Sequence, residues 1–276
     1  MILKYRFPDP QVNQILELFL QMIMDFFGNH LVSVVLYGSI VFDDLAPGYG
    51  DIDFLALVDE NLSDNMCRQL VKLRKPLKNG DFGIIGQMLE GAFLPTEMLD
   101  PSNKGKAFWW GTSGERVWEN NQLGWLVLKV IRERGIVIWG VDITNDIPEA
   151  SRMELLGDIR KACKGIMEHG SGGELHSVDW LLTAARLLLY LKEGKLSSKS
   201  EAALWGYQNA KGKWRELLPR AKELRLNPSL RDTVESKEWL DGLTQPIKDA
   251  CAELETELRR ALKFMKNGGM NARLEQ

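Results

Sequence analysis

Two short apolar runs joined by a loop constrain the fold of this chain more than any other feature. The first run covers residues 31–37 and ends at Gly38-Ser39, and the second covers residues 52–58. Both runs are short and rich in Val, Leu and Ile, which is typical of buried β-strands. We therefore expect two neighbouring strands, with polar residues at the strand ends that flank the loop.

The second run begins with two carboxylates, Asp51 and Asp53, on either side of Ile52. Residues two apart on a strand project from the same face. Two carboxylates held side by side repel each other and are costly to ionise unless a cation lies between them. Hard divalent ions that prefer oxygen ligands, Mg²⁺ above all, suit this arrangement. If Asp51 is only a strand-start residue, Asp53 remains an unexplained carboxylate inside an apolar strand.

The end of the first run suits a phosphate group. Gly38 allows a sharp turn and lets a ligand approach the backbone closely. Ser39 opens a short helix-like stretch over residues 40–44, and the free N–H groups at such a start bind phosphate readily. The alternative is that Gly38 and Ser39 form an ordinary turn.

The order Gly-Ser, a spacer over residues 40–50 and Asp-x-Asp resembles the nucleotidyltransferase superfamily. The resemblance implies ATP, or less readily another NTP, as co-substrate. It implies that Gly38 and Ser39 contact the phosphates and that Asp51 and Asp53 hold two Mg²⁺ ions, which in two-metal sites lie about 3.5–4 Å apart.

The same family carries a third carboxylate on the strand after Asp-x-Asp. The apolar segment at residues 82–94 predicts such a strand, and Glu90 is its only acidic residue. Glu90 is therefore the candidate for a further metal ligand or for the general base that takes the acceptor proton. The alternative is a solvent-facing strand residue.

Composition limits the class of protein. The chain has 276 residues, of which 45% are hydrophobic and 26% charged, as in ordinary soluble globular proteins. Proteins that bind nucleic acid normally carry an excess of basic residues. The net charge of −3 therefore argues against a nucleic-acid partner. Its three cysteines are far apart and predict reduced thiols in a cytoplasmic protein rather than a disulfide framework. The apolar run at residues 15–27 contains Glu17, Gln21 and Asp25 and is too short to span a bilayer. The oligomeric state is left open.

The distribution of elements predicts an α+β chain of two domains. Residues 1–148 are expected to form a nucleotidyltransferase catalytic domain, a small mixed sheet with flanking helices, and residues 149–266 an α-helical bundle that closes over nucleotide and acceptor. Residues 267–276 are expected to be a disordered tail.

Helix and strand signals give the expected elements within these domains. In the first half we expect helices at 9–28, 64–78 and 120–134, an irregular aromatic segment at 102–118 and a strand at 136–139. In the second half we expect helices at 149–168, 175–193, 199–211 and 246–266.

The segment at residues 179–205 is similar to the C-terminal domain of the aminoglycoside adenylyltransferases that modify streptomycin and spectinomycin. In that family an arginine on a helix and a lysine after the next turn reach the ATP phosphates, and Arg186 and Lys199 stand at those positions. Cations suit a triphosphate, which stays negative with Mg²⁺ bound. Alternatively both are solvated helix charges, although Arg186 lies in an otherwise apolar helix.

The chain departs from that family where the cationic drug is recognised. The corresponding stretch here is residues 170–178, and His176 stands about where an aspartate is expected. Glu174 and Asp179 are candidate acidic contacts to the acceptor, or simply residues at a helix start. Trp109 and Trp110 are candidates for stacking on a sugar or base, or are core residues.

These observations predict a Mg²⁺-dependent nucleotidyltransferase that transfers AMP from ATP to a hydroxyl of a small acceptor and releases pyrophosphate. Aminoglycoside-type antibiotics, and hence antibiotic resistance, are among the candidate acceptors and roles. The alternatives are a nucleotidyltransferase that modifies a protein or an RNA end, and a family member that binds nucleotide without catalysis.

Overall fold

The first half of the chain forms a single mixed β-sheet. The computed structural model describes residues 3–46, 48–112 and 114–274. The chain divides into two compact units, Met1–Ala150 and Ser151–Gln276. The sheet belongs to the first unit and has six strands in the order β5-β4-β3-β2-β1-β6. Its strands are β1 Leu31–Tyr37, β2 Ile52–Val58, β3 Leu89–Pro95, β4 Lys104–Gly111, β5 Gly114–Asn120 and β6 Ile136–Gly140.

Strand direction decides which ends meet. β2 and β3 are parallel, whereas β1 runs antiparallel to β2 and to β6, and β4 runs antiparallel to β3 and to β5. The C-terminal end of β1 therefore lies beside the N-terminal ends of β2 and β3. The expected mixed sheet is confirmed, and its polar residues gather at this end.

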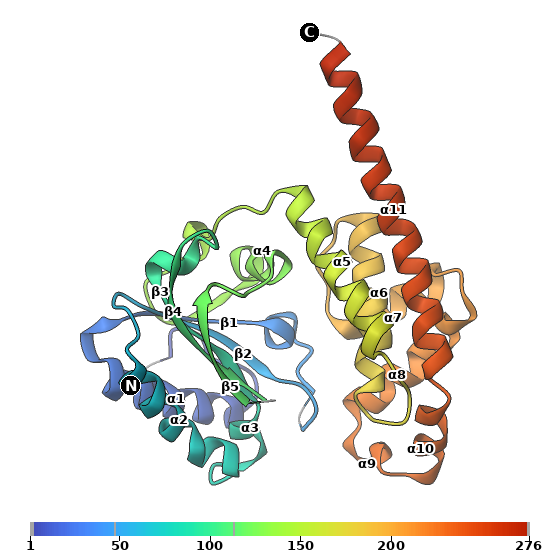
Figure 1. Cartoon of the computed structure of the whole chain (residues 1–276). Coiled ribbons are helices and arrows are strands. Elements are labelled where there is room, and N and C mark those ends of the chain that lie inside the picture. Colours follow the sequence, from blue (N-terminus) through green and yellow to red (C-terminus); the bar gives the residue numbers. More distant parts are fainter. Residues whose placement is uncertain (1–2, 47, 113, 275–276) are drawn as a thin grey trace. The chain divides into compact units, whose positions relative to one another are not determined.

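Helices cover both faces of the sheet (Figure 1). On one face lie α1 (Pro10–Phe27), α2 (Asp64–Asn79) and α3 (Gly83–Gln87), whose apolar residues form one core with alternate residues of the strands. On the other face α4 (Trp125–Arg134) packs on the remaining strand residues and forms a second core. The two cores follow from the alternation of side chains along each strand.

Two segments of the first unit differ from the sequence prediction. The segment at 82–94 is not one strand, because α3 occupies its first part and β3 starts only at Leu89. The segment at 102–118 is not irregular, since it forms the hairpin of β4 and β5. Hairpin pairing with a neighbouring strand overrides weak local alternation in such segments.

The second unit is helical, as expected. Its helices are α5 Arg152–His169, α6 Ser177–Glu193, α7 Lys199–Asn209, α8 Leu218–Leu226, α9 Pro228–Arg231, α10 Val234–Asp241 and α11 Thr244–Leu274. α6 packs against α7 and α11, and α11 packs against α5. The fold class, a mixed sheet with flanking helices followed by a helical bundle, is confirmed.

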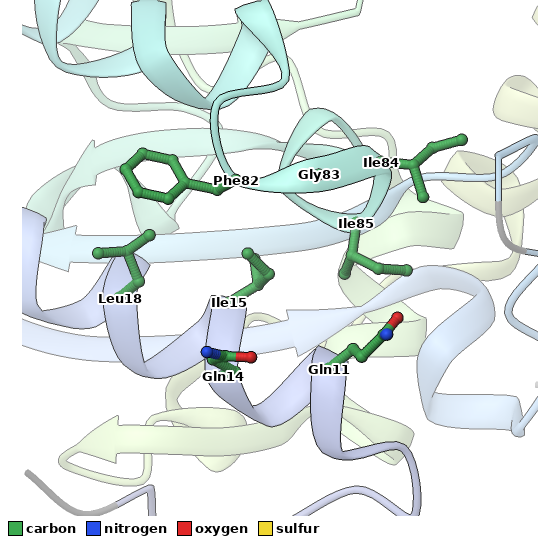
Figure 2. A pocket seen from close by; sticks show the side chains of 8 residues that line it. All are labelled: Gln11, Gln14, Ile15, Leu18, Phe82, Gly83, Ile84 and Ile85. Atoms are coloured by element: carbon green, nitrogen blue, oxygen red, sulfur yellow. The ribbon is translucent and has the colours of Figure 1, made fainter.

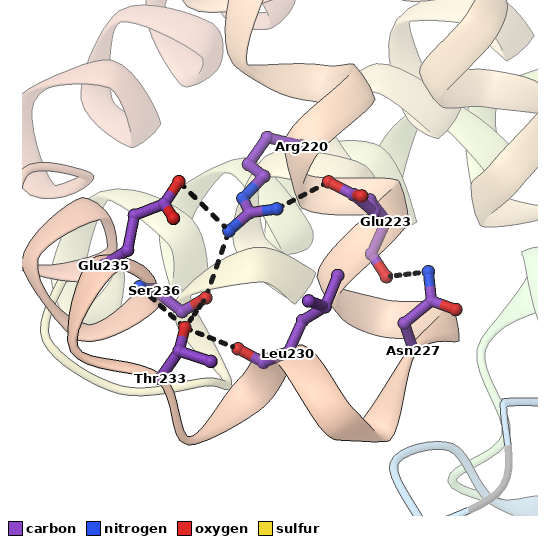
Figure 3. Close-up of polar contacts among 7 residues, drawn as sticks. All are labelled: Arg220, Glu223, Asn227, Leu230, Thr233, Glu235 and Ser236. Atoms are coloured by element: carbon purple, nitrogen blue, oxygen red, sulfur yellow. Dashed lines mark hydrogen bonds and ion pairs between the residues drawn. The ribbon is translucent and has the colours of Figure 1, made fainter.

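A polar network holds the short helices α8 to α10, which the sequence did not predict (Figure 3). Arg220 donates to Glu223 at 2.6 Å and to the buried hydroxyl of Ser236 at 3.2 Å, and pairs with Glu235 at 3.5 Å. Thr233 caps α10 and donates to the carbonyl of Leu230 at 3.0 Å. The contacts of Arg220 with Glu235 and Ser236 join α8 to α10, which periodicity within one helix cannot reveal.

Helix α11 continues to Leu274, where the sequence predicts a disordered tail from residue 267. Ion pairs one turn apart, Arg259 with Glu255 and Arg260 with Glu257, support the helix up to this region. Gly268 and Gly269 lower helix propensity without forbidding a helix. Within the described residues, no helix is both long enough and apolar enough to cross a membrane.

Candidate active site

Three polar side chains lie in a row across the central strands. Tyr37 on β1 is paired with Asp53 on β2, and Asp53 is paired with Glu90 on β3. Neighbouring strands are about 4.8 Å apart, and partners in register project from the same face. Asp51 directly precedes β2 and shares the face of Asp53. Strand register therefore places Asp53 and Glu90 on one face of the sheet, with Asp51 just before β2.

The negative charges of these carboxylates act on the pKa of Tyr37. Burial raises the pKa of its hydroxyl well above the ordinary value, and the charges of Asp53, Glu90 and Asp51 raise the pKa further. Both causes disfavour the phenolate. Tyr37 thus stays a neutral hydroxyl beside the carboxylates, a role that the sequence did not suggest.

The Gly-Ser turn is fitted to the aspartates. Gly38 has φ of +73°, and a Cβ built on it would lie 1.9 Å from Oδ2 of Asp53. Only glycine fits there, because of both the backbone conformation and the missing space. Ser39 is the second residue of the 3-10 helix Gly38–Phe42 and donates to the carbonyl of Asp51 at 3.3 Å. The two motifs that the loop separates in sequence are therefore in contact.

The β4–β5 hairpin holds the carboxylate of Glu90 through a hydrogen bond. Its Oε2 accepts a hydrogen bond from the backbone N–H of Thr112, in the turn between β4 and β5. This contact fixes one oxygen and thereby orients the side chain. A fixed orientation is useful for a general base and for a metal ligand alike.

The donor set fits Mg²⁺ in chemistry. Asp51, Asp53 and Glu90 offer only oxygen ligands, which Mg²⁺ prefers, and the missing side chain of Gly38 is what allows the Asp53 carboxylate to occupy its place beside the turn. Within the described residues, however, no three His, Cys, Asp or Glu side chains are already grouped to hold an ion. The two-ion site therefore stays a prediction.

The two candidate tryptophans have different environments. Trp110 is fully buried and packs edge-on against Phe93 and Phe54, at 4.9 and 5.8 Å between ring centroids. Its prediction as an acceptor contact is wrong, because side-chain alternation turns it into the core under α1. Trp109 lies on the face of Glu90, half-buried and stacked on Trp118 at 5.0 Å. Its acceptor role stays a prediction.

In the helical unit, Lys199 begins α7 and forms an ion pair with Asp179 of α6. Burial lowers the pKa of Lys199, Asp179 raises it, and the positive charges of Arg186 and Arg225 lower it. Arg186 and Lys199 are thus close enough to repel each other, as expected of two groups gathered for an anion. Their binding to phosphate stays a prediction.

The two acidic acceptor candidates also differ. The carboxylate of Asp179 already has two partners: it forms an ion pair with Lys199, and its Oδ2 lies 3.5 Å from Nδ1 of His176. The hydrogen bond with Asp179 is the largest cause that raises the pKa of His176. Glu174 is exposed and precedes α6. Contact of either residue with an acceptor stays a prediction.

A surface pocket of about 480 Å³ lies between α1 and the segment that includes α3 (Figure 2). It is lined by Gln11, Gln14, Ile15, Leu18, Phe82, Gly83, Ile84 and Ile85. None of these side chains is charged, and none is a predicted site residue. The pocket is therefore separate from the row of carboxylates.

The second unit has a family match. Residues 144–252 match the family described as aminoglycoside adenylyltransferase, C-terminal domain. The matched range contains Arg186 and Lys199, on which the resemblance in the sequence rested. That resemblance is confirmed, and the match supports the predicted enzyme class, a nucleotidyltransferase.

A solved structure shows the same fold for the chain as a whole. Spectinomycin adenyltransferase AAD(9) from Enterococcus faecialis, with ATP and spectinomycin, aligns with a TM-score of 0.71 and 19% identity. The alignment covers 88% of this chain and 99% of that chain. No curated protein matches the sequence.

The sequence did not indicate several residues of the candidate site. Tyr37 was treated as the end of a strand, although its place before Gly38 puts it beside the aspartates. Thr112 carries no signal in the sequence, because the hairpin that brings it to Glu90 was not predicted. Its contact with Glu90 joins segments far apart in the chain, and no local pattern reveals it.

Proposed function

We propose that this chain is a Mg²⁺-dependent adenylyltransferase that transfers AMP from ATP to a hydroxyl group of a small acceptor. The observation that carries the proposal is the pairing of Asp53 with Glu90 on neighbouring strands, next to a Gly-Ser turn that contacts Asp51. Carboxylates beside a phosphate-binding turn are what a nucleotidyl transfer needs, and the family match of the helical unit supports the same reaction.

The reaction exchanges one P–O bond for another. The acceptor oxygen attacks the α-phosphorus, the bond from that phosphorus to the bridging oxygen breaks, and pyrophosphate leaves. The acceptor hydroxyl loses its proton, and Glu90 is placed to accept it if it serves as the base. Thr112 orients Glu90, and neutral Tyr37 provides a hydroxyl beside the carboxylates.

Asp51 and Asp53, with Glu90 as the third candidate, would hold the Mg²⁺ ions. Bound there, the ions would neutralise the charge on the triphosphate and on the attacking oxygen. Gly38 gives the phosphates access to the backbone and Ser39 offers its hydroxyl.

We further propose that residues 149–266 supply Arg186 and Lys199 to the same triphosphate and close over nucleotide and acceptor. Two cations that repel each other in the free protein gain most when an anion joins them. The support is the closeness of Arg186 to Lys199 together with the family match. ATP would then contact residues of both units.

For the acceptor we propose a cationic, hydroxyl-bearing antibiotic of the aminoglycoside or spectinomycin type, modified in the cytoplasm. The structural neighbour holds ATP and spectinomycin. Half-buried Trp109, exposed Glu174 and Asp179 are the candidate contacts. Adenylylation of such a drug would confer resistance to it.

The test of the proposal is Asp53→Asn, compared with Asp59→Asn as the matched control. Asp59 follows the same strand at its other end and pairs with His30 on the surface at 2.9 Å. The catalytic variant should lose pyrophosphate release by about 10³-fold or more, since metal stabilisation is worth several kcal/mol and each 1.4 kcal/mol is tenfold. The control should keep its rate. Equal rates for the two variants would refute the assignment of Asp53.

A further inference from the structure

A buried arginine, Arg74, lies beside the strand that carries Glu90. It sits on α2 and its side chain is only 3% exposed, although arginines on helices are mostly exposed. Its Nη1 donates to the carbonyl oxygen of Gly111 at 2.5 Å and to Glu115 at 3.2 Å, and its Nη2 donates to the carbonyl oxygen of Leu89 at 3.5 Å. A buried guanidinium with these acceptors has a fixed position.

One peptide group joins Arg74 to Glu90. The carbonyl of Gly111 and the N–H of Thr112 belong to the same amide: the oxygen accepts from Arg74, and the N–H donates to Oε2 of Glu90. A positive charge on the amide oxygen draws electrons from the nitrogen, so the N–H becomes a stronger donor. The hydrogen bond to the carboxylate is charge-assisted and gains from this polarisation.

Arg74 also contacts the main chain next to Glu90. The carbonyl of Leu89 belongs to the amide that precedes Glu90, so the guanidinium contacts both the main chain of the carboxylate and its hydrogen-bond donor. Gly111 has no room for a side chain, since a Cβ there would lie 2.5 Å from Nε1 of Trp109. The amide is thus confined from two sides.

We propose that Arg74 is a positioning residue for Glu90 and acts through the amide between Gly111 and Thr112. The guanidinium of Arg74 fixes the position of this amide and makes its N–H a stronger donor. The N–H in turn fixes the orientation of the Glu90 carboxylate. The catalytic consequence rests on the proposed function, whereas the hydrogen-bond chain itself does not.

The chain of hydrogen bonds is tested without any reaction, by NMR of the full-length protein labelled with ¹⁵N-threonine. The Thr112 amide is assigned as the signal lost in Thr112→Ser. Its proton should resonate downfield and move upfield in Glu90→Gln and in Arg74→Met. Arg74→Lys keeps the positive charge but loses the planar set of donors, so it should give an intermediate shift of the Thr112 proton. If Arg74→Met does not fold, the shift in Arg74→Lys alone tests the proposal. An unchanged Thr112 signal in the Arg74 variants would overturn the proposal.

The kinetic test compares Arg74→Met with Arg132→Met. Arg132 also lies in the first unit and donates to two backbone carbonyls, those of Asn145 at 2.9 Å and Ile147 at 2.6 Å. Misplacement of a catalytic group by about 1 Å costs on the order of 10² in rate. We therefore expect kcat to fall by about that factor in Arg74→Met with little change in KM for ATP, partial recovery in Arg74→Lys, and an unchanged kcat in Arg132→Met.

The two tests separate the inference from the proposed function. An equal loss of kcat in both Met variants would make Arg74 merely structural and overturn the proposal. If the wild-type protein transfers no nucleotidyl group to any acceptor, the proposed function fails, while the Thr112 resonance still decides whether Arg74 controls Glu90.

Discussion

Lys199 and Asp179 form an ion pair between the first turn of α7 and the first turn of α6. The side chains are 26% and 18% exposed, so the pair is partly shielded from water. Asp179 raises the pKa of Lys199 and so opposes the lowering by burial and by the positive charge of Arg186. The pair therefore links a residue predicted to contact the acceptor to a residue predicted to bind phosphate.

Replacing Asp179 by Asn should change how ATP binding depends on pH. Burial lowers the pKa of Lys199, so this lysine loses its proton at a lower pH than an exposed lysine. A triphosphate favours the charged form, so affinity should fall as the pH rises through the pKa of Lys199. Asp179→Asn removes the charge that raises this pKa, so the fall should begin at lower pH.

Calorimetric titration with ATP across the alkaline range measures this shift. Glu201→Gln is the matched control, because Glu201 pairs with Lys195 in an exposed ion pair beside the same helix start. The control should follow the wild-type curve. If the midpoint in Asp179→Asn stays where it is or moves to higher pH, Lys199 does not bind the phosphates in the way proposed.

The pKa of His176 should fall in Asp179→Asn. The hydrogen bond to Asp179 is the main cause that raises its pKa, and burial and Lys199 oppose it. Because the pKa is raised, the stabilisation by this pair is complete below the ordinary value of about 6.5 and is lost as the pH rises through the folded-state pKa. NMR titration should show a lower midpoint for His176 in Asp179→Asn. His30, which pairs with Asp59, should not move, and a parallel shift of His30 would indicate a global change instead.

Trp110→Ala should destabilise the first unit. Trp110 is fully buried and meets Phe93, Phe54 and Phe19. Truncation of a buried Trp to Ala costs about 3–5 kcal/mol, which urea unfolding can measure. Trp109→Ala should cost less, because Trp109 is only half-buried. A larger loss for Trp109 would contradict the assignment of the two faces.

Arg186→Ala should weaken binding of ATP but not of adenosine. A hydrogen bond to a charged group is worth about 1.5–3 kcal/mol, so the Kd for ATP with Mg²⁺ should rise roughly 10- to 150-fold. Adenosine lacks phosphates and should bind as before. Equal losses for both ligands would mean that Arg186 acts on the fold of the helical unit rather than on phosphate.

The sequence predicted the parts of the site that are local in the chain. Asp51, Asp53 and Gly38-Ser39 could be placed from strand alternation and turn chemistry, and the structure joins them through the Ser39 hydrogen bond. Glu90 was assigned correctly to β3 although the start of that strand was not.

What could not be predicted depends on pairing between distant segments. The β4–β5 hairpin decides that Trp110 faces the core while Trp109 lies on the face of Glu90, and a tryptophan pair in sequence carries no such information. The same hairpin carries Thr112 to Glu90 and gives Arg74 its buried acceptors. A basic residue near a helix end is usually solvated, so its sequence position indicated nothing about the site.

The most direct test of the central claim is the mass of the acceptor after reaction. The purified full-length chain would be incubated with ATP, Mg²⁺ and either spectinomycin or streptomycin, with the Asp53→Asn variant in parallel. The account predicts that one of these acceptors gains the mass of a single adenylyl group while pyrophosphate is released in equal amount, and that the variant produces neither. Tight binding of ATP and Mg²⁺ with no mass gain on either drug or on a wider panel of small hydroxyl compounds would contradict it.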